Sequence, residues 1–116
     1  MHNPSILQLV GNTPMVACRN LIQNPNVKLY FKLEGHNPGG SVKDRPALNM
    51  IQSALERAEI DTNTKLIEAT SGNTGIALAM IAGVFGLDIE LVMPENATKE
   101  RVQTMRAYGA KVTLTS

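Results

Sequence analysis

From residue 41 onward, segments with helical periodicity alternate with short apolar runs that are typical of buried strands. Residues 41–58 carry apolar side chains at spacings of three and four, and 74–85 is apolar almost all round. The strand-like runs and a third helical segment continue this order at 65–69, 89–93, 99–108 and 111–114. Short connections between such elements predict right-handed crossovers and a mostly parallel sheet with helices on both faces. We therefore expect an α/β protein with three layers, α/β/α.

The first predicted helix has two possible starting points. Ser41 followed by Asp44 matches a capping box, whereas Pro46 favours the first helical position. We favour the start at Ser41, because few amide hydrogens near the first turn have a partner within the helix. Gly109 is expected to close the third helix in the left-handed conformation.

The sheet is expected to be incomplete at its carboxyl end, because no helical segment follows the strand-like run at 111–114. Residues 1–25 are rich in turn formers and are expected to be irregular, and 27–33 alternates like a strand. We divide the chain into a segment at 1–40 and a truncated amino-terminal α/β domain at 41–116.

Charge and composition exclude several classes of function. Eleven Lys and Arg residues against ten Asp and Glu residues give a net charge of +1, which leaves no basic surplus for a nucleic acid. A single cysteine, Cys18, rules out an internal disulfide and a multi-cysteine zinc site. The longest mostly apolar stretch, 75–87, has thirteen residues, and about 20 are needed to cross a bilayer. These features predict a cytoplasmic protein without a metal site that binds neither nucleic acid nor membrane.

Five of the nine glycines lie in two loops, each of which leads into a predicted helix. Helix amino termini offer free amide hydrogens and the positive end of the helix dipole, which suit a carboxylate or a phosphate. The second loop follows the carboxyl end of a predicted strand and supplies three hydroxyls and an amide, from Thr70, Ser71, Thr74 and Asn73. This loop can bind a small anionic substrate, and it can equally be a hydroxyl-rich helix cap.

The first loop, at 37–45, contains Lys43. It is not a P-loop, because that motif has a lysine directly after the closing glycine, and no dinucleotide-binding G-x-G-x-x-G is present in the chain. Lys43 is either a solvated surface lysine or, at this glycine-bracketed helix start, an imine-forming lysine.

Two motifs point to a known family, N-P-G-G-S-V-K-D-R at 37–45 and E-A-T-S-G-N-T-G at 68–75. G-N-T-P at 11–14 and M-P-E at 93–95 follow the same order and spacing. Together these motifs resemble the cysteine synthase family, which are pyridoxal-phosphate enzymes of the tryptophan-synthase-β fold type. R-P-A after the lysine motif and M-R-A-Y-G-A at 105–110 are most similar to the B-type isozyme of O-acetylserine sulfhydrylase.

The resemblance implies roles for the residues of both loops. Lys43 would form a Schiff base with pyridoxal 5'-phosphate and later move the α-proton of the substrate, and Asn73 would hydrogen-bond the ring hydroxyl of the cofactor. The substrate α-carboxylate would be held by Thr70, Ser71, Gly72 and Thr74. The implied reaction is a β-replacement that forms L-cysteine from O-acetyl-L-serine and sulfide.

The chain also departs from the family. Family members are considerably longer, and they carry a glycine- and threonine-rich loop for the cofactor phosphate and a later serine that faces the pyridine nitrogen. Neither feature is present in this sequence. We therefore expect an amino-terminal portion that is inactive alone, whose residues 1–40 pack partly with a missing carboxyl-terminal domain. The full-length protein would be a homodimer, as is typical of the family.

Other functions stay open at this point. A cystathionine β-synthase or a serine/threonine dehydratase of the same fold would use similar lysine and carboxylate loops, and a fragment could also be a non-catalytic partner. We interpret Cys18 as a buried structural thiol, His36 as a solvated loop residue and Glu34 as a flanking residue without a catalytic role.

Overall fold

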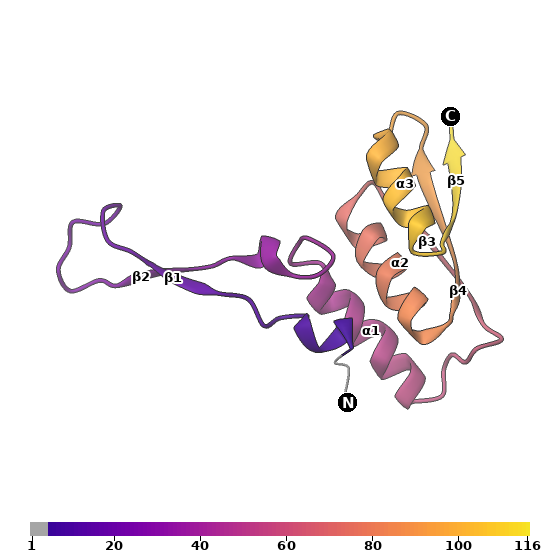
Figure 1. Cartoon of the computed structure of the whole chain (residues 1–116), viewed down its shortest axis with the longest axis horizontal. Helices are drawn as coiled ribbons and strands as arrows, with labels where there is room; N and C mark the ends of the chain where they lie inside the picture. The colour runs from indigo at the N-terminus through magenta and orange to yellow at the C-terminus, as the bar shows by residue number, and fades with distance from the viewer. Residues whose placement is uncertain (1–4) are drawn as a thin grey trace.

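A long β-hairpin projects from an α/β body in the computed structural model, which describes residues 5–116 (Figure 1). In the hairpin, β1 (Met15–Cys18) pairs antiparallel with β2 (Leu29–Lys32). The strand predicted over 27–33 is therefore confirmed at its centre, whereas the expectation that 1–25 is irregular is wrong at β1, which is ordered by its pairing with β2. The radius of gyration is 17.1 Å, whereas about 13 Å is typical of a compact chain of this length. The difference arises because the hairpin extends away from the body (Figure 1).

Three parallel strands form the sheet of the body: β3 (Lys65–Ala69), β4 (Asp88–Pro94) and β5 (Lys111–Thr115). Their order in the sheet is β3-β4-β5, and Leu91 of the central strand lies opposite Val112 of β5. Each strand is reached from the previous one through a helix. The predicted α/β class with a parallel sheet is therefore confirmed.

The three helices of the body are α1 (Asp44–Glu56), α2 (Asn73–Phe85) and α3 (Lys99–Ala107). α2 packs against α1, α3 and β4, and its residues 77–82 are all buried. This central position explains why the α2 sequence is apolar almost all round. Gly109 follows α3 with a φ of 100°, so the predicted left-handed closure is confirmed.

Helices cover one face of the sheet within residues 5–116, as Figure 1 shows. The strand order advances in one direction, and right-handed crossovers that advance in one direction place their helices on the same face. Leu91 and Met93 point to this face and are fully buried, whereas Ile67 on the opposite face is 65% exposed. Helices on the other face would require the strand order to reverse direction. The described strands run in the order β3-β4-β5 without a reversal, so the second of the two expected helical layers is not found within residues 5–116.

The first helix starts at Asp44, and the expected start at Ser41 is wrong. Ser41 instead ends the preceding turn, where its Oγ accepts a hydrogen bond from the Lys43 amide at 3.1 Å. A start at Ser41 would place Pro46 in the second turn, where its missing N–H and its ring oppose the helical hydrogen bonds. A start at Asp44 places Pro46 in the first turn, where no N–H is required.

A single turn of 3-10 helix, η1 (Ile6–Leu9), lies beside α2 and adds Ile6, Leu7 and Val10 to the edge of the core. A second one, η2 (Glu34–His36), leads from β2 into the lysine loop. None of the helices in residues 5–116 combines the length and the apolar character needed to cross a membrane.

Candidate active site

The two loops that carry the candidate residues lie at one end of the helical layer. α1 and α2 pack against each other, and in Figure 1 both run from the left side of the body toward its lower right. The loop before α2 also leaves the carboxyl end of β3. In open α/β sheets ligands bind outside the carboxyl ends of the strands, so this end is the candidate site.

Lys43 is exposed and directly precedes α1. Its backbone carbonyl accepts the first helical hydrogen bond, from the Ala47 amide at 3.1 Å. Within residues 5–116 its Nζ has no hydrogen-bond or salt-bridge partner. The backbone of Lys43 is therefore fixed by the helix, while its amine stays free to react.

A network around Glu34 and Arg45 fastens the lysine loop to the start of the chain. The Arg45 guanidinium pairs with both oxygens of the Glu34 carboxylate and donates from Nη2 to the Gly11 carbonyl at 3.0 Å. The Thr13 hydroxyl donates to Glu34 Oε2 at 2.6 Å. Glu34 and Arg45, which lie before and after Lys43 in the sequence, are therefore both bonded to the turn at 11–13.

Sequence reasoning gave Glu34 no role and treated Arg45 only as part of a motif. The available signal was weak, because a charge pair eleven residues apart has no helical or strand spacing to identify it. The structure assigns both residues to the support of the loop. The Arg45 guanidinium, followed by the Thr13 hydroxyl, lowers the pKa of Glu34 to about 2.

We expect acid to release this network as the pH falls from 4.5 towards 2. The Glu34 carboxyl binds a proton less readily in the folded chain than in the unfolded chain, so its contribution to stability is complete above pH 4.5 and is lost progressively as the pH falls to about 2. Glu34→Gln should therefore flatten the fall in the free energy of unfolding across this window, measured by urea unfolding at a series of pH values. Glu59→Gln is the matched control, because Glu59 pairs with Arg57 on the surface and its pKa is also lowered. Equal effects of the two variants would show that the network adds nothing beyond a surface pair.

Two buried polar side chains hold the rest of the lysine loop. Asn37 is 3% exposed, and its side chain accepts from the Gly11 amide at 2.7 Å and donates to the Glu34 carbonyl at 2.9 Å. Asp44 is fully buried and accepts from the Gly39 amide at 2.6 Å, while its Oδ1 has no partner among the described residues. Burial raises the pKa of Asp44. A side chain at position 39 would collide with this carboxylate, so the approach requires glycine.

The loop before α2 is held from within by Thr70. Its Oγ1 accepts from the Gly72 amide at 3.3 Å and from the Gly75 amide at 3.1 Å. Ser71 and Asn73 are exposed, Thr74 is half-buried and Gly72 is buried. Thr70 thus stabilises the loop, while the side chains of Ser71 and Asn73 remain accessible to a ligand.

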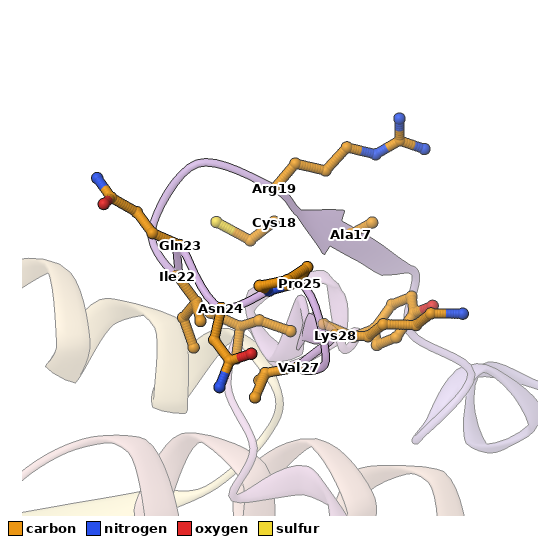
Figure 2. A pocket seen from close by; sticks show the side chains of 11 residues that line it. Ala17, Cys18, Arg19, Ile22, Gln23, Asn24, Pro25, Val27 and Lys28 are labelled. Atoms are coloured by element: carbon orange, nitrogen blue, oxygen red, sulfur yellow. The ribbon is translucent and has the colours of Figure 1, made fainter.

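A separate pocket of about 390 Å³ lies on the hairpin, and Figure 2 shows its lining. Cys18 points toward the interior of the loop, whereas Arg19 and Lys28 extend away from it (Figure 2). Cys18 is half-buried in β1, less than expected of a structural thiol. None of the candidate residues lines this pocket, so it is not the site. Within residues 5–116, no group of three or more His, Cys, Asp or Glu side chains is arranged to hold a metal ion.

The fold and the two loops correspond to one family of enzymes. The model of the pyridoxal-phosphate dependent enzyme family matches residues 6–116, and the chain belongs to this family. It is 54% identical over 113 residues to cysteine synthase B of Pseudomonas aeruginosa, a match that covers 97% of this chain and 38% of that protein. The resemblance to cysteine synthases that the motifs indicate is therefore confirmed.

Solved structures give the same result. A hydrogen sulfide-producing enzyme from Fusobacterium nucleatum is 50% identical, with a TM-score of 0.85 over 99% of this chain and 38% of that one. An O-acetylserine dependent cystathionine β-synthase from Helicobacter pylori is 41% identical, with a TM-score of 0.85 over 99% of this chain and 38% of that one. The chain thus spans 38% of the length of each of these proteins.

Proposed function

We propose that this chain supplies the lysine loop and the carboxylate loop of a cysteine synthase, which forms L-cysteine from O-acetyl-L-serine and sulfide. The observation that carries the proposal is the unpaired amine of Lys43, on a loop that is fastened by Arg45 and Asn37. This loop opens at the same end of the helical layer as the loop at 70–74. The 54% identity to a cysteine synthase B supports the same reaction.

The residues present fit pyridoxal 5'-phosphate as cofactor. An accessible primary amine can hold its aldehyde covalently, and the exposed amide of Asn73 can hydrogen-bond its ring hydroxyl. When bound, the cofactor serves as the electron sink for the substrate carbanion. In this proposal Lys43 and Asn73 are the residues of this chain that hold it.

The loop at 70–74 is proposed to bind the α-carboxylate of the substrate. It ends at the positive end of the α2 dipole, and the proposed site is formed by Thr70, Ser71, Gly72 and Thr74. The Gly72 amide itself is bonded to Thr70 Oγ1, so Gly72 contributes its backbone position while the hydroxyls and the Thr74 amide act as donors. With the carboxylate held there, the Lys43 amine would take the α-proton and return it at the end of the reaction. The bond to the acetate oxygen breaks at the β-carbon, and the sulfide sulfur forms its bond at the same carbon.

A cystathionine β-synthase is the second candidate, because the Helicobacter pylori relative of that description is 41% identical. The serine/threonine dehydratase and the non-catalytic partner have no comparable relative among those described above. The choice depends on the acceptor that attacks the β-carbon. Both loops of this chain would serve either acceptor.

Competition between acceptors tests the proposal. The protein as its gene encodes it would receive O-acetyl-L-serine with sulfide, thiosulfate or homocysteine, and the products would be separated chromatographically. We expect kcat/KM with sulfide to exceed the other values by about tenfold or more, a difference of about 1.4 kcal/mol in transition-state binding. Faster formation of cystathionine would favour the second candidate, and no product with any acceptor would favour the non-catalytic partner.

We also propose that residues 1–40 pack partly against a carboxyl-terminal domain, since the described part of this segment exposes Met15, Val16, Tyr30 and Phe31 on the hairpin. The longer relatives have room for such a domain, because the match covers only 38% of their length. A homodimer is proposed for the full-length protein, in keeping with its resemblance to the family. The proposed location is the cytoplasm, where the free thiol of Cys18 would stay reduced.

A further inference from the structure

Arg101 connects the first turn of α3 to the loop that opens α2. Its Nη1 donates a hydrogen bond to the Ser71 carbonyl at 3.0 Å, across thirty residues of sequence. The hydrogen bond is charge-assisted, and such bonds are stronger than those between neutral groups. Arg101 is also the only side chain among residues 5–116 that is recorded as bonded to this carbonyl.

The approach of Arg101 depends on the absence of a side chain at position 72. A Cβ built on Gly72 would lie 2.7 Å from Nη1 and 2.8 Å from Cζ of Arg101. Both distances are shorter than any ordinary van der Waals contact, so an alanine at position 72 would displace the guanidinium. The hydrogen bond between Arg101 and the Ser71 carbonyl therefore depends on the glycine at position 72.

The two polar atoms of the peptide between Ser71 and Gly72 are both held. Arg101 binds the carbonyl oxygen, and Thr70 Oγ1 accepts the Gly72 amide hydrogen at 3.3 Å. The plane of this peptide is therefore fixed. Its orientation also limits the directions of the next two amides along the chain, those of Asn73 and Thr74. Within residues 5–116 the amides of Asn73 and Thr74 have no acceptor.

We propose that Arg101 is a positioning residue, which locks the Ser71–Gly72 peptide so that the amides of Asn73 and Thr74 face the substrate α-carboxylate. The inference rests on the function proposed above and extends it to the side chain that sets the carboxylate geometry. Arg101 acts through the peptide and does not touch the substrate. Loss of the lock would weaken carboxylate binding in the ground state and in the transition state alike, so the main effect would be on KM.

Two substitutions separate position from charge. Arg101→Met removes the hydrogen bond and the charge, whereas Arg101→Lys keeps the charge and loses the planar donor pair. Lys99→Met is the matched control, because it removes a positive charge from the same exposed turn of α3 without touching Ser71. We expect Arg101→Met to raise KM for O-acetyl-L-serine about tenfold with little change in kcat, Arg101→Lys to raise it less, and Lys99→Met to leave it unchanged. An equal rise in Lys99→Met would overturn the proposal in favour of a general charge effect.

Amide hydrogen exchange tests the lock without any activity. We expect Arg101→Met to speed exchange of the Gly72 amide about fivefold, with no change in Lys99→Met. In a Gly72→Ala background, where the guanidinium is already displaced, the same substitution should speed exchange of the residue 72 amide by less than about twofold. Unchanged exchange in Arg101→Met would overturn the lock. Absence of cysteine synthesis in the unsubstituted protein, tested as its gene encodes it, would overturn the proposed function, and exchange would still decide the lock.

Discussion

Lys43→Ala is expected to abolish the absorbance band that pyridoxal 5'-phosphate gives when it is bound to a protein amine. Only an amine can hold the cofactor in this way, and within the described residues the Lys43 amine is exposed and unpaired at the candidate site. Cysteine formation should fall by about a thousandfold or more, because the same amine is proposed to carry the α-proton. The measurements are a visible absorbance spectrum after reconstitution with the cofactor and a rate of cysteine formation.

The control for this experiment is Lys65→Ala, which removes another exposed lysine from the same body without entering either loop. The fold should survive Lys43→Ala, since the Lys43 side chain makes no recorded polar contact with residues 5–116. A band that persists in Lys43→Ala would contradict the assignment of Lys43. A protein that shows no band even when unsubstituted would support the non-catalytic partner, or a truncated portion that cannot hold the cofactor.

Leu91→Ala is expected to be among the most destabilising substitutions in the body. Leu91 lies in the central strand and is 0% exposed beneath the helical layer. Truncation of such a side chain costs about 3–4 kcal/mol, from lost burial and the cavity left behind. A domain of this size has about 5–15 kcal/mol of stability in total, so the loss should be visible as a large shift of the urea unfolding midpoint.

Ile67→Ala is the matched comparison on the uncovered face of the same sheet. Ile67 is 65% exposed, so its truncation should cost less than about 1 kcal/mol. Both variants remove a branched aliphatic side chain from a strand, so strand propensity contributes to each. Similar losses for the two would contradict a core that lies on one face of the sheet only.

The alternation of elements was predictable because it depends on local periodicity. The apolar sequence of α2 required burial on all sides, and its position between α1, α3 and β4 provides it. A glycine at position 109 similarly indicated that α3 ends in a residue with left-handed backbone conformation. The side of the sheet on which the helices lie was not predictable, because it follows from the order of the strands and the periodicity of a segment does not contain that order.

The candidate site was predictable only in part. The motifs indicated Lys43 and the loop at 70–74, because residue types and spacing alone carried that resemblance. Their supports, Glu34, Arg45 and Arg101, were not predicted as such. Each acts on a backbone atom or a side chain that is distant in sequence, and such partners become neighbours only when the chain has folded.

The bond between Arg45 and the Gly11 carbonyl has a consequence for the order of folding. The body is made of consecutive strand–helix units, whose contacts close over short loops and are expected to form early. The turn at Gly11 leaves the ribosome first, yet its partner follows thirty-four residues later. During synthesis the amino-terminal turn must therefore remain undocked until α1 has emerged. We expect the lysine loop to become rigid only after α1 has formed, although Gly11 is translated before it.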